Sequence, residues 1–330
     1  MVTISEIAER ANVSKTLVSR VLNNKSGVSP EKRKAIQTVI DDLNYRPNAL
    51  ARSLVTQKTQ TIGVVMDSLC DSYFFDLING LQDTAEKLGY NVIFCSARGN
   101  ADIKSNYIDF FSQGRTDGII SYGSYLRDQN VIGDTNSCFV LIEGYVPDVP
   151  INNVLVDNYK GAYEATVHLI KAGYKRISHF SGDMNYKVSL DRFNGFINAM
   201  HDYSIPISSS DIINADFLEE SGYEEMQKII SDGNIPEAIF FGADRTAFGA
   251  IKAMYEHGLK TPDDIAIIGF DDDLPKDYDI VYPKLTTLRQ PLYKMGVESV
   301  NLLVEAINNP KVKPKVTVFE PELIIRDTCK

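Results

Sequence analysis

Five hydrogen-bond donors stand at helical spacing near the start of the chain. They are Lys15, Thr16, Ser19, Arg20 and Asn23. Side chains of these types donate to base edges in a DNA groove or to phosphate oxygens. The apolar residues between them fall on the opposite side of the same helix, as expected where one face packs on a core and the other faces outward. The segment therefore predicts a helix that contacts DNA.

Carboxyl and aromatic side chains recur directly after apolar runs in the remainder of the chain. They are Asp67, Glu143, Asp244 and Asp271 at the ends of four such runs, and Phe74 at the start of the helical stretch after the first run. Carboxylates accept hydrogen bonds from neighbouring hydroxyls, and aromatic faces pack against C–H groups. These residues predict a cleft for a small polyhydroxylated ligand.

Each of these side chains also has a purely structural interpretation. An acidic residue after a strand often caps the following helix, which would account for Asp244 and Asp271 without any ligand. Phe74 could equally be part of an apolar interior. Both interpretations stay open at the level of the sequence.

Local signals define the helices that would position the DNA-contacting donors. Thr3 and Glu6 have the spacing of a capping box, and Asn12 can adopt the left-handed conformation that ends a helix. Ser14 can cap the second helix, and Ser29 with the proline that follows it can start a third. Two short helices joined by so tight a turn predict a helix-turn-helix, whose second helix can enter a major groove.

The charge of the chain is divided unevenly. Residues 1–60 hold ten Lys and Arg and five Asp and Glu, a net charge of +5, whereas the whole chain carries −10. Residues 61–330 therefore carry −15. A basic head on an acidic body favours local attraction to phosphate without general affinity for nucleic acid.

From residue 61 onward, apolar runs alternate with helical stretches. The runs are Thr61–Asp67, Asn91–Ala97, Gly118–Tyr122, Cys138–Glu143, Arg176–Gly182, Asp211–Ala215, Ala238–Ala243 and Ile265–Phe270. Apolar strands separated by helices indicate parallel sheets covered on both faces. This length is too great for one small sheet, so we predict an α/β body of two doubly wound parallel-sheet subdomains behind a small all-α domain. Their facing strand ends would form the cleft.

The motifs along nearly the whole chain resemble the lactose/galactose repressor family of bacterial transcription regulators. The residues that carry the resemblance are Val13-Ser14-x-x-x-Val18-Ser19-Arg20-Val21-x-Asn23, Leu43-Asn44-Tyr45-x-Pro47-Asn48-x-x-Ala51-x-x-Leu54, Ile62-Gly63-Val64, Asp157-Asn158, Arg192-x-x-Gly195-Phe196, Gly269-Phe270-Asp271-Asp272 and Leu285-Thr286-Thr287-Leu288-x-Gln290. The resemblance implies a periplasmic-binding-protein-like body and a repressor controlled by a small effector, expected to be a sugar or sugar derivative.

The resemblance also implies a division of the chain. Residues 1–46 would be the helix-turn-helix domain, 47–60 a hinge helix and linker, and 61–330 the ligand-binding and dimerisation domain. The body would divide into 61–158 with 289–322, and 159–288. In the hinge, Asn48 would contact DNA and Leu54 would wedge between base pairs in the minor groove.

For the effector, the resemblance adds three residues to those found from strand ends. Arg192 matches a ligand-gripping arginine, Phe217 an aromatic wall and Gln290 a polar contact. Each has a structural alternative: a salt bridge, interior packing or a hinge backbone partner, respectively. One departure affects specificity, because Ala243 stands where many relatives have asparagine. The resemblance therefore does not specify a particular sugar.

Several classes of site and location are disfavoured by the sequence. The four cysteines lack C-x-x-C spacing, the four histidines lack metal-site spacing, and no phosphate-binding or nucleophile motif occurs. We therefore expect no cofactor and no metal. Without a signal peptide or a membrane-length apolar stretch, we expect a cytoplasmic protein with no membrane partner. The short segment after residue 327 favours a homodimer without a tetramerising tail.

Two further function classes compete with the regulator. A solute-binding protein of a sugar transporter would use the same cleft, but the basic helix-turn-helix argues against it. A sugar-modifying enzyme could use paired carboxylates, although no independent catalytic motif is present. The preferred prediction is a non-enzymatic repressor that binds palindromic operator DNA. The sequence leaves open whether the effector induces or corepresses, and whether a phosphocarrier protein is a second partner.

Overall fold

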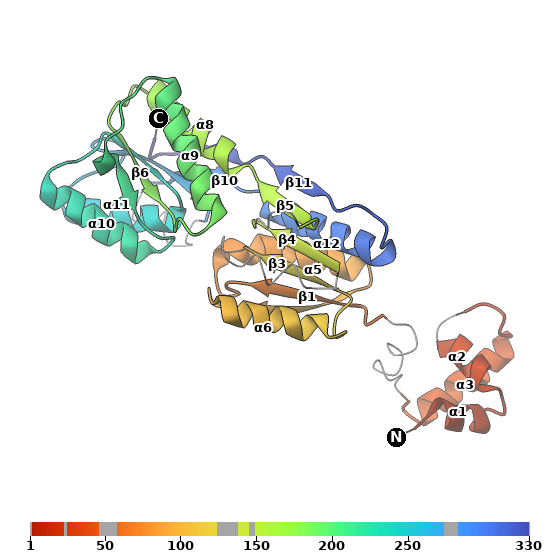
Figure 1. The fold of residues 1–330 in the computed structure, drawn as a ribbon. Coiled ribbons are helices and arrows are strands. Elements are labelled where there is room, and N and C mark those ends of the chain that lie inside the picture. The colour runs from red at the N-terminus through yellow and green to blue at the C-terminus, as the bar shows by residue number, and fades with distance from the viewer. Residues whose placement is uncertain are drawn as a thin grey trace. The chain divides into compact units, whose positions relative to one another are not determined.

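The computed structural model describes residues 2–22, 25–45, 58–123, 138–144, 149–273 and 283–329. The chain forms two compact units, Met1–Thr59 and Gln60–Lys330 (Figure 1). Within the described ranges, no helix has both the length and the apolar character needed to cross a bilayer.

Residues 2–22 and 25–45 of the first unit form a bundle of three helices, α1 (Ile4–Arg10), α2 (Lys15–Leu22) and α3 (Pro30–Asp42). The Thr3 side chain accepts a hydrogen bond from the backbone of Glu6, and Ser29 caps α3 in the same way. The apolar faces of the helices meet in a small core of Ile7, Ala8, Val18, Val21, Ile36 and Ile40. This confirms the three helices expected from their caps and apolar stripes.

The turn between α1 and α2 has the conformation that the sequence indicated. Asn12 has a φ of 51°, in the left-handed region, and the Ser14 hydroxyl accepts from the backbone N–H of Leu17 at 3.3 Å. The turn is therefore held by short-range hydrogen bonds. Three of the predicted DNA contacts, Asn23, Asn48 and Leu54, lie outside the described residues.

The first of two sheets in the second unit has six strands, all parallel, in the order β11-β5-β4-β3-β1-β2. Its strands are β1 (Thr61–Met66), β2 (Asn91–Ser96), β3 (Gly118–Tyr122), β4 (Cys138–Ile142), β5 (Asn152–Val156) and β11 (Val316–Phe319). Helices α5 (Phe75–Lys87) and α12 (Leu292–Asn308) cover one face, and α6 (Ala101–Ser112) covers the other (Figure 1). The short helix η1 (Ser72–Phe74) precedes α5.

Two glycines allow α12 to close against α5. A Cβ on Gly80 would lie 2.2 Å from the carbonyl oxygen of Tyr293, and one on Gly296 would lie 2.5 Å from that of Leu77. Because no side chain intervenes, the two backbones pack directly. This contact ties a C-terminal helix to the N-terminal subdomain.

The second sheet has the order β12-β10-β9-β8-β6-β7, parallel except for the antiparallel pairing of β12 with β10. Its strands are β6 (Ile177–Ser181), β7 (Ile212–Asn214), β8 (Ala238–Phe241), β9 (Ala266–Asp271), β10 (Thr286–Arg289) and β12 (Glu322–Ile324). Helices α8 (Asn158–Lys171) and α9 (Lys187–Asp202) cover one face, and α10 (Glu219–Asp232) and α11 (Asp244–Glu256) cover the other. A short helix, η2 (Ser209–Asp211), precedes β7.

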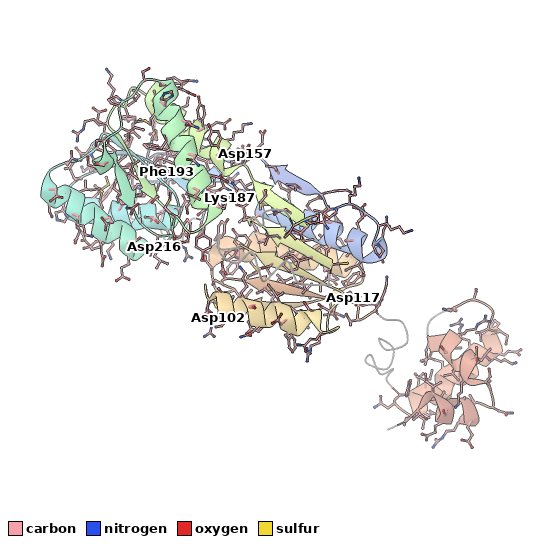
Figure 2. The ribbon with its side chains drawn as sticks, viewed as in Figure 1. Asp102, Asp117, Asp157, Lys187, Phe193 and Asp216 are labelled. Carbon is pink, nitrogen blue, oxygen red and sulfur yellow. The ribbon has the colours of Figure 1, made fainter. Side chains whose placement is uncertain are left out.

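Over the described parts of the second unit, the chain passes between the two subdomains three times. The first passage is at Asp157, which caps α8 (Figure 2). The second lies between β10 and α12, and the third between β11 and β12. Residues 322–329 thus return to the second subdomain, where the Thr328 hydroxyl accepts from the Thr286 N–H at 2.8 Å. The predicted boundary at 322 did not include this return.

All eight predicted strand runs are strands, which confirms the α/β fold class with two doubly wound parallel sheets. Four further strands, β5, β10, β11 and β12, were not predicted. They lie at or next to the passages between subdomains, where the alternation of strand and helix is interrupted.

Candidate functional site

The outward face of α2 carries the predicted DNA-contacting donors. Lys15, Thr16 and Arg20 are exposed and Ser19 is partly exposed, whereas Val18 and Val21 are buried. The helix therefore presents its polar residues to solvent and its apolar residues to α1 and α3. This is the arrangement that groove recognition requires.

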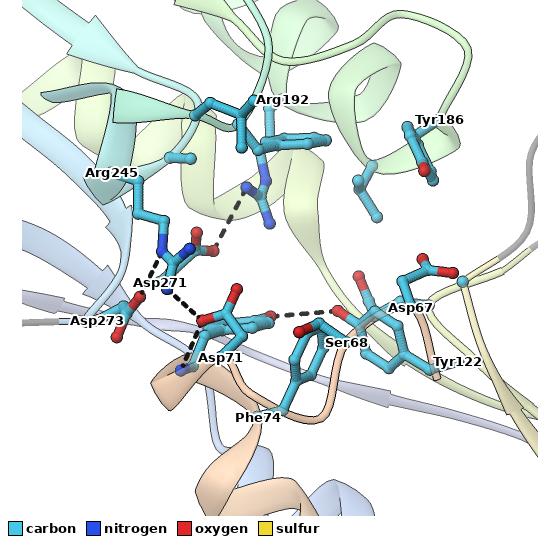
Figure 3. Close-up of a pocket in the computed structure, with 17 residues that line it drawn as sticks. Asp67, Ser68, Asp71, Phe74, Tyr122, Tyr186, Arg192, Arg245, Asp271 and Asp273 are labelled. Atoms are coloured by element: carbon cyan, nitrogen blue, oxygen red, sulfur yellow. Dashed lines mark hydrogen bonds and ion pairs between the residues drawn. The ribbon is translucent and has the colours of Figure 1, made fainter. Parts of the chain in front are cut away.

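A cavity of about 250 Å³ lies between the two sheets of the second unit (Figure 3). Both subdomains contribute to its wall, chiefly through residues just past strand ends or in the first turns of helices. The lining residues are Asp67, Ser68, Asp71, Tyr73, Phe74, Tyr122, Gly123, Glu143, Tyr186, Val188, Arg192, Phe217, Leu218, Ala243, Arg245, Asp271 and Asp273.

A buried polar network, here called the hinge network, joins Glu143, Asn158, Arg192, Asp271 and Gln290. The Asn158 amide donates to Glu143 at 2.8 Å, and Arg192 Nε donates to Asn158 Oδ1 at 2.8 Å. Arg192 also lies 3.5 Å from Asp271, whose Oδ1 accepts from Gln290 Nε2 at 2.8 Å. Asn158 and Gln290 lie at two of the three passages, so the network spans the junction of the subdomains.

Arg192 is the central donor of this network. Arg192 is 4% exposed, and its guanidinium carbon lies 3.7 Å from the centroid of the Phe270 ring. One terminal nitrogen, Nη1, donates to the Gly242 carbonyl at 2.5 Å. Among the described residues nothing accepts from the other, Nη2, which is therefore available to an oxygen atom in the cavity.

Burial shifts the acid–base behaviour of both network carboxyls. It raises the pKa of Glu143 to about 7, although hydrogen bonds from Asn158 and the Val156 backbone oppose the rise. Burial likewise raises the pKa of Asp271 to about 7, with Arg192 opposing. Each carboxyl group therefore exchanges its proton near neutral pH, and each can donate or accept a hydrogen bond there.

The same two carboxyls stand on unusual backbone. Glu143 has a φ of 51° and Asp271 a φ of 120°. Such conformations cost a non-glycine residue on the order of 1–3 kcal/mol each and persist only where the surrounding structure holds them. They direct both side chains into the network, and such outliers concentrate at ligand sites.

A second set of polar side chains also joins the two subdomains, away from the places where the chain passes between them. This set, here called the rim cluster, consists of Asp71, Ser72, Arg245 and Asp273. Arg245 at the start of α11 donates to Asp71 at 2.5 Å and to Asp273 at 3.1 Å. The Ser72 hydroxyl donates to Asp273 at 2.8 Å. Asp71 and Ser72 belong to the first subdomain, and Arg245 and Asp273 belong to the second. The bonds Arg245–Asp71 (Figure 3) and Ser72–Asp273 therefore join the two subdomains.

Aromatic rings from both subdomains complete the wall. Phe74 meets Tyr73 and Tyr122 edge to face, each at 4.9 Å between ring centroids, and the two tyrosine hydroxyls are 3.3 Å apart. From the second subdomain, Tyr186 meets Phe217 edge to face at 5.9 Å. Apolar faces and phenol hydroxyls thus alternate along the wall, which suits a ligand with both C–H faces and hydroxyls.

Six of the eight predicted effector residues line the cavity. They are Asp67, Phe74, Glu143, Arg192, Phe217 and Asp271. Asp244 does not line it: the carboxyl is fully buried, accepting from Thr287 at 2.6 Å and from the Asp273 backbone at 3.0 Å. Its burial, and next the charge of Asp271, raise its pKa well above the usual value. Gln290 also lies behind the wall and acts on Asp271.

Several lining residues were not predicted as site residues. Tyr122 ends the predicted strand β3, so the strand-end rule that found Asp67 would also have found it. Asp71 shows the local signal of a helix cap, accepting from the Tyr73 backbone at 3.1 Å. Arg245 and Asp273 had only their proximity to Asp244 and Asp271 as a signal. Their partners are too distant in sequence to be found from spacing.

Comparison with known proteins agrees with this architecture. The profile of "Bacterial regulatory proteins, lacI family" matches residues 3–48, and that of "Periplasmic binding proteins and sugar binding domain of LacI family" matches residues 59–326. The chain is 34% identical over its full length to the HTH-type transcriptional repressor PurR of Actinobacillus pleuropneumoniae serotype 3, covering 99% of that relative. It is 32% identical to the regulator RegA of Clostridium saccharobutylicum, over 99% of this chain and 98% of RegA.

A solved structure extends the similarity to the arrangement of the chain. The Lac repressor dimer bound to operator and the anti-inducer ONPF matches with a TM-score of 0.88 and 26% identity, covering 99% of this chain and 98% of that one. Profile, sequence and fold agree over both units. The chain belongs to the LacI family of bacterial regulatory proteins and is a DNA-binding transcription regulator with a periplasmic-binding-protein-like body.

Proposed function

We propose that this regulator is a repressor whose affinity for a near-palindromic operator is set by a small polyhydroxylated effector, a sugar or sugar derivative, bound in the cavity. The observation that carries the proposal is the composition of the wall. Both subdomains contribute carboxyl groups and aromatic rings to the wall, and the second contributes the Nη2 group of Arg192. A ligand that contacts both subdomains can favour one relative orientation, limited by its differential affinity for the two states.

The proposed contacts follow from the geometry of the wall. Arg192 donates to a ligand oxygen, Asp271 and Glu143 accept from hydroxyls, and Phe74 or Phe217 packs against a C–H face. The solved Lac repressor that resembles this chain is bound to operator DNA and to the small ligand ONPF at the same time. This supports a protein that binds both DNA and a small effector here. We expect induction rather than corepression. A phosphocarrier protein as a further partner stays a prediction from the resemblance alone.

We propose a homodimer as the DNA-binding form. One recognition helix reads only a few base pairs, so two copies related by a two-fold axis are required for useful specificity. Lys15, Thr16 and Arg20 would reach base edges, and Ser19 would contribute a further polar contact. Asn23 and the hinge residues Asn48 and Leu54 remain proposed DNA contacts.

The DNA-binding part is tested with the DNA upstream of the regulator's own operon. We expect Arg20→Ala to cost roughly 1–3 kcal/mol of operator binding and to relax discrimination at one position in each half-site. Arg10→Ala is the matched control, because Arg10 is an exposed arginine of the same unit but belongs to α1. Unchanged affinity and sequence preference for Arg20→Ala would show that α2 is not the recognition helix.

The effector part is tested by calorimetry against sugars, phosphosugars and purines, paired with operator titrations. We expect at least one sugar to bind and to change operator affinity. Tight binding of a purine alone would refute the effector class and leave the regulator itself standing. Turnover of a bound sugar would instead favour the sugar-modifying enzyme.

A further inference from the structure

A buried ammonium group lies directly behind one end of the cavity. Lys104 is 5% exposed, and its Nζ donates to the carbonyl oxygens of Tyr122 at 2.7 Å and Gly123 at 2.5 Å. Gly123 has a φ of 62°. A buried ammonium group so close to a cavity would by itself favour an anion there, such as a phosphate group.

Asp67 stands between this ammonium and the ligand space. Its carboxyl lines the cavity, is 23% exposed and lies 3.6 Å from Lys104 Nζ. The left-handed turn at Gly123 brings the backbone so close that a Cβ there would lie 3.3 Å from Asp67 Oδ2. The end of the cavity therefore presents a carboxylate with the positive charge behind it.

The rest of the wall reinforces this negative character. Among the lining residues that the structure describes, five are carboxylic acids and two are arginines. Both guanidiniums already face wall carboxyls, Arg192 with Asp271 and Arg245 with Asp71 and Asp273. The start of α9 reaches the cavity through Val188, but a helix N-terminus contributes only about half an elementary charge.

From this geometry we infer that Asp67 sets the charge selectivity of the cavity, which takes an uncharged polyhydroxylated effector and rejects a phosphorylated one. The inference deepens the effector part of the proposed function and rests on it. Asp67 accepts from a ligand hydroxyl and at the same time offsets the charge of Lys104. Replacing it by asparagine removes one negative charge from the wall and leaves the ammonium in place, so the same end becomes attractive to an anion.

The experiment compares the full-length wild type with Asp67→Asn by isothermal titration calorimetry at pH 8, where Glu143 and Asp271 are mostly ionised. The probes are inorganic phosphate and three matched pairs: D-glucose with its 6-phosphate, D-ribose with its 5-phosphate, and D-fructose with its 6-phosphate. Asp109→Asn is the matched control, since Asp109 is an exposed carboxyl on α6 outside the wall. Asp67→Ser is a second variant in case the first fails to fold.

We expect the Asp67 variants to bind inorganic phosphate at least about tenfold more tightly than the wild type, a change of about 1.4 kcal/mol. Asp109→Asn should behave as the wild type does. Adding Lys104→Met to Asp67→Asn should abolish the gain, because the ammonium is what holds the anion. Within each sugar pair, the preference of the variants should shift toward the phosphorylated member.

Two results would overturn the inference. One is a wild type that binds a phosphorylated sugar as tightly as its neutral partner. The other is phosphate affinity in both Asp67 variants at the level of the wild type. If no neutral sugar binds the wild type while the phosphate gain appears in the variants, the sugar effector fails and the role of Asp67 stands.

Discussion

The hinge network and the rim cluster use the same chemistry, a guanidinium with carboxylates, in different surroundings. Arg192 in the hinge network has a side chain 5% exposed, whereas that of Arg245 in the rim cluster is 40% exposed. Arg192 contacts an amide, a carbonyl and a carboxyl; Arg245 contacts two carboxyls. The two sites should therefore differ in the free energy that is lost when the guanidinium is separated from its carboxylates.

A buried charge that loses its partners is left in a medium that does not solvate it, which costs several kcal/mol. A partly exposed pair exchanges its partner for water and counterions, and typically contributes about 0–1 kcal/mol. We therefore expect the hinge network to persist in every relative orientation of the subdomains. The rim cluster can open at low cost, so it is the part on which effector binding can act.

The largest expected effect comes from removing the central donor of the hinge network. Arg192→Ala should lower the free energy of unfolding by about 3 kcal/mol or more, because it removes the positive charge beside the buried Asp271 carboxyl and the donor to Asn158 Oδ1. It should also weaken effector binding roughly tenfold or more, through loss of a charged hydrogen bond. Chemical denaturation and calorimetry measure the two effects.

Arg192→Lys sharpens this test. Lysine keeps the charge but cannot donate simultaneously in the directions of Asn158 and Gly242, so we expect little rescue of stability. Rescue to the wild-type value would mean that charge alone holds the network. The directions of the Arg192 hydrogen bonds would then not distinguish the hinge network from the rim cluster.

The next effect is the pH dependence that Asp271 of the hinge network contributes. The pKa of Asp271 is raised to about 7, so between about pH 4 and pH 7 the folded protein keeps a proton that the unfolded chain has lost. The stability contributed by this group is complete below about pH 4 and is lost as the pH rises through 7. Asp271→Asn should remove the contribution of this group and leave that of Glu143, because the asparagine Oδ1 still accepts from Gln290 without titrating.

We expect the difference in unfolding free energy between wild type and Asp271→Asn to change by about 2 kcal/mol from pH 5 to pH 8, with the wild type losing stability. This is less than the full linkage value, because the side chain keeps 16% of its surface exposed. Urea denaturation at both pH values, with Asp109→Asn as control, measures it. Parallel pH profiles for wild type and Asp271→Asn would contradict a raised pKa.

The smallest expected effect belongs to the rim cluster. In a double-mutant cycle of Asp71→Asn and Arg245→Gln, we expect a coupling in unfolding free energy below about 1 kcal/mol. The coupling should shrink further in 0.5 M salt, because exposed charges are screened. Effector affinity should change more than stability, since opening the cluster shifts the orientation of the subdomains. A coupling above 3 kcal/mol would make the rim cluster equivalent to the hinge network.

The sequence predicted those parts whose interactions are local. Caps at Thr3, Ser14 and Ser29 and the turn at Asn12 depend on residues three or four positions away, so spacing alone indicates them. The strand-end rule likewise placed Asp67, Glu143 and Asp271 at the cavity, since the carboxyl ends of parallel strands meet at one edge.

The same rule failed where two strand-end residues differ only in what packs against them. Asp244 and Asp271 both end strand runs, yet Asp244 is enclosed by Thr287 and the Asp273 backbone, while Asp271 faces the cavity. Gln290 was predicted to contact the effector, with a hinge backbone partner as the structural alternative, but its amide donates to the Asp271 carboxyl behind the wall. Which of the two carboxyls faces the cavity depends on the packing of β10, and that strand was not predicted.

By itself the sequence determined the class of the protein, its helix-turn-helix, its doubly wound sheets and the strand-end residues Asp67, Glu143 and Asp271 that line the cavity. These follow from short-range hydrogen bonds and from the periodicity of apolar residues. Only the tertiary structure decided that Arg245 meets Asp71 across 174 residues, that Ser72 meets Asp273 across 201, and that a buried Lys104 stands behind Asp67. Such pairs depend on how two whole sheets face each other, and that orientation is the sum of packing over the entire body.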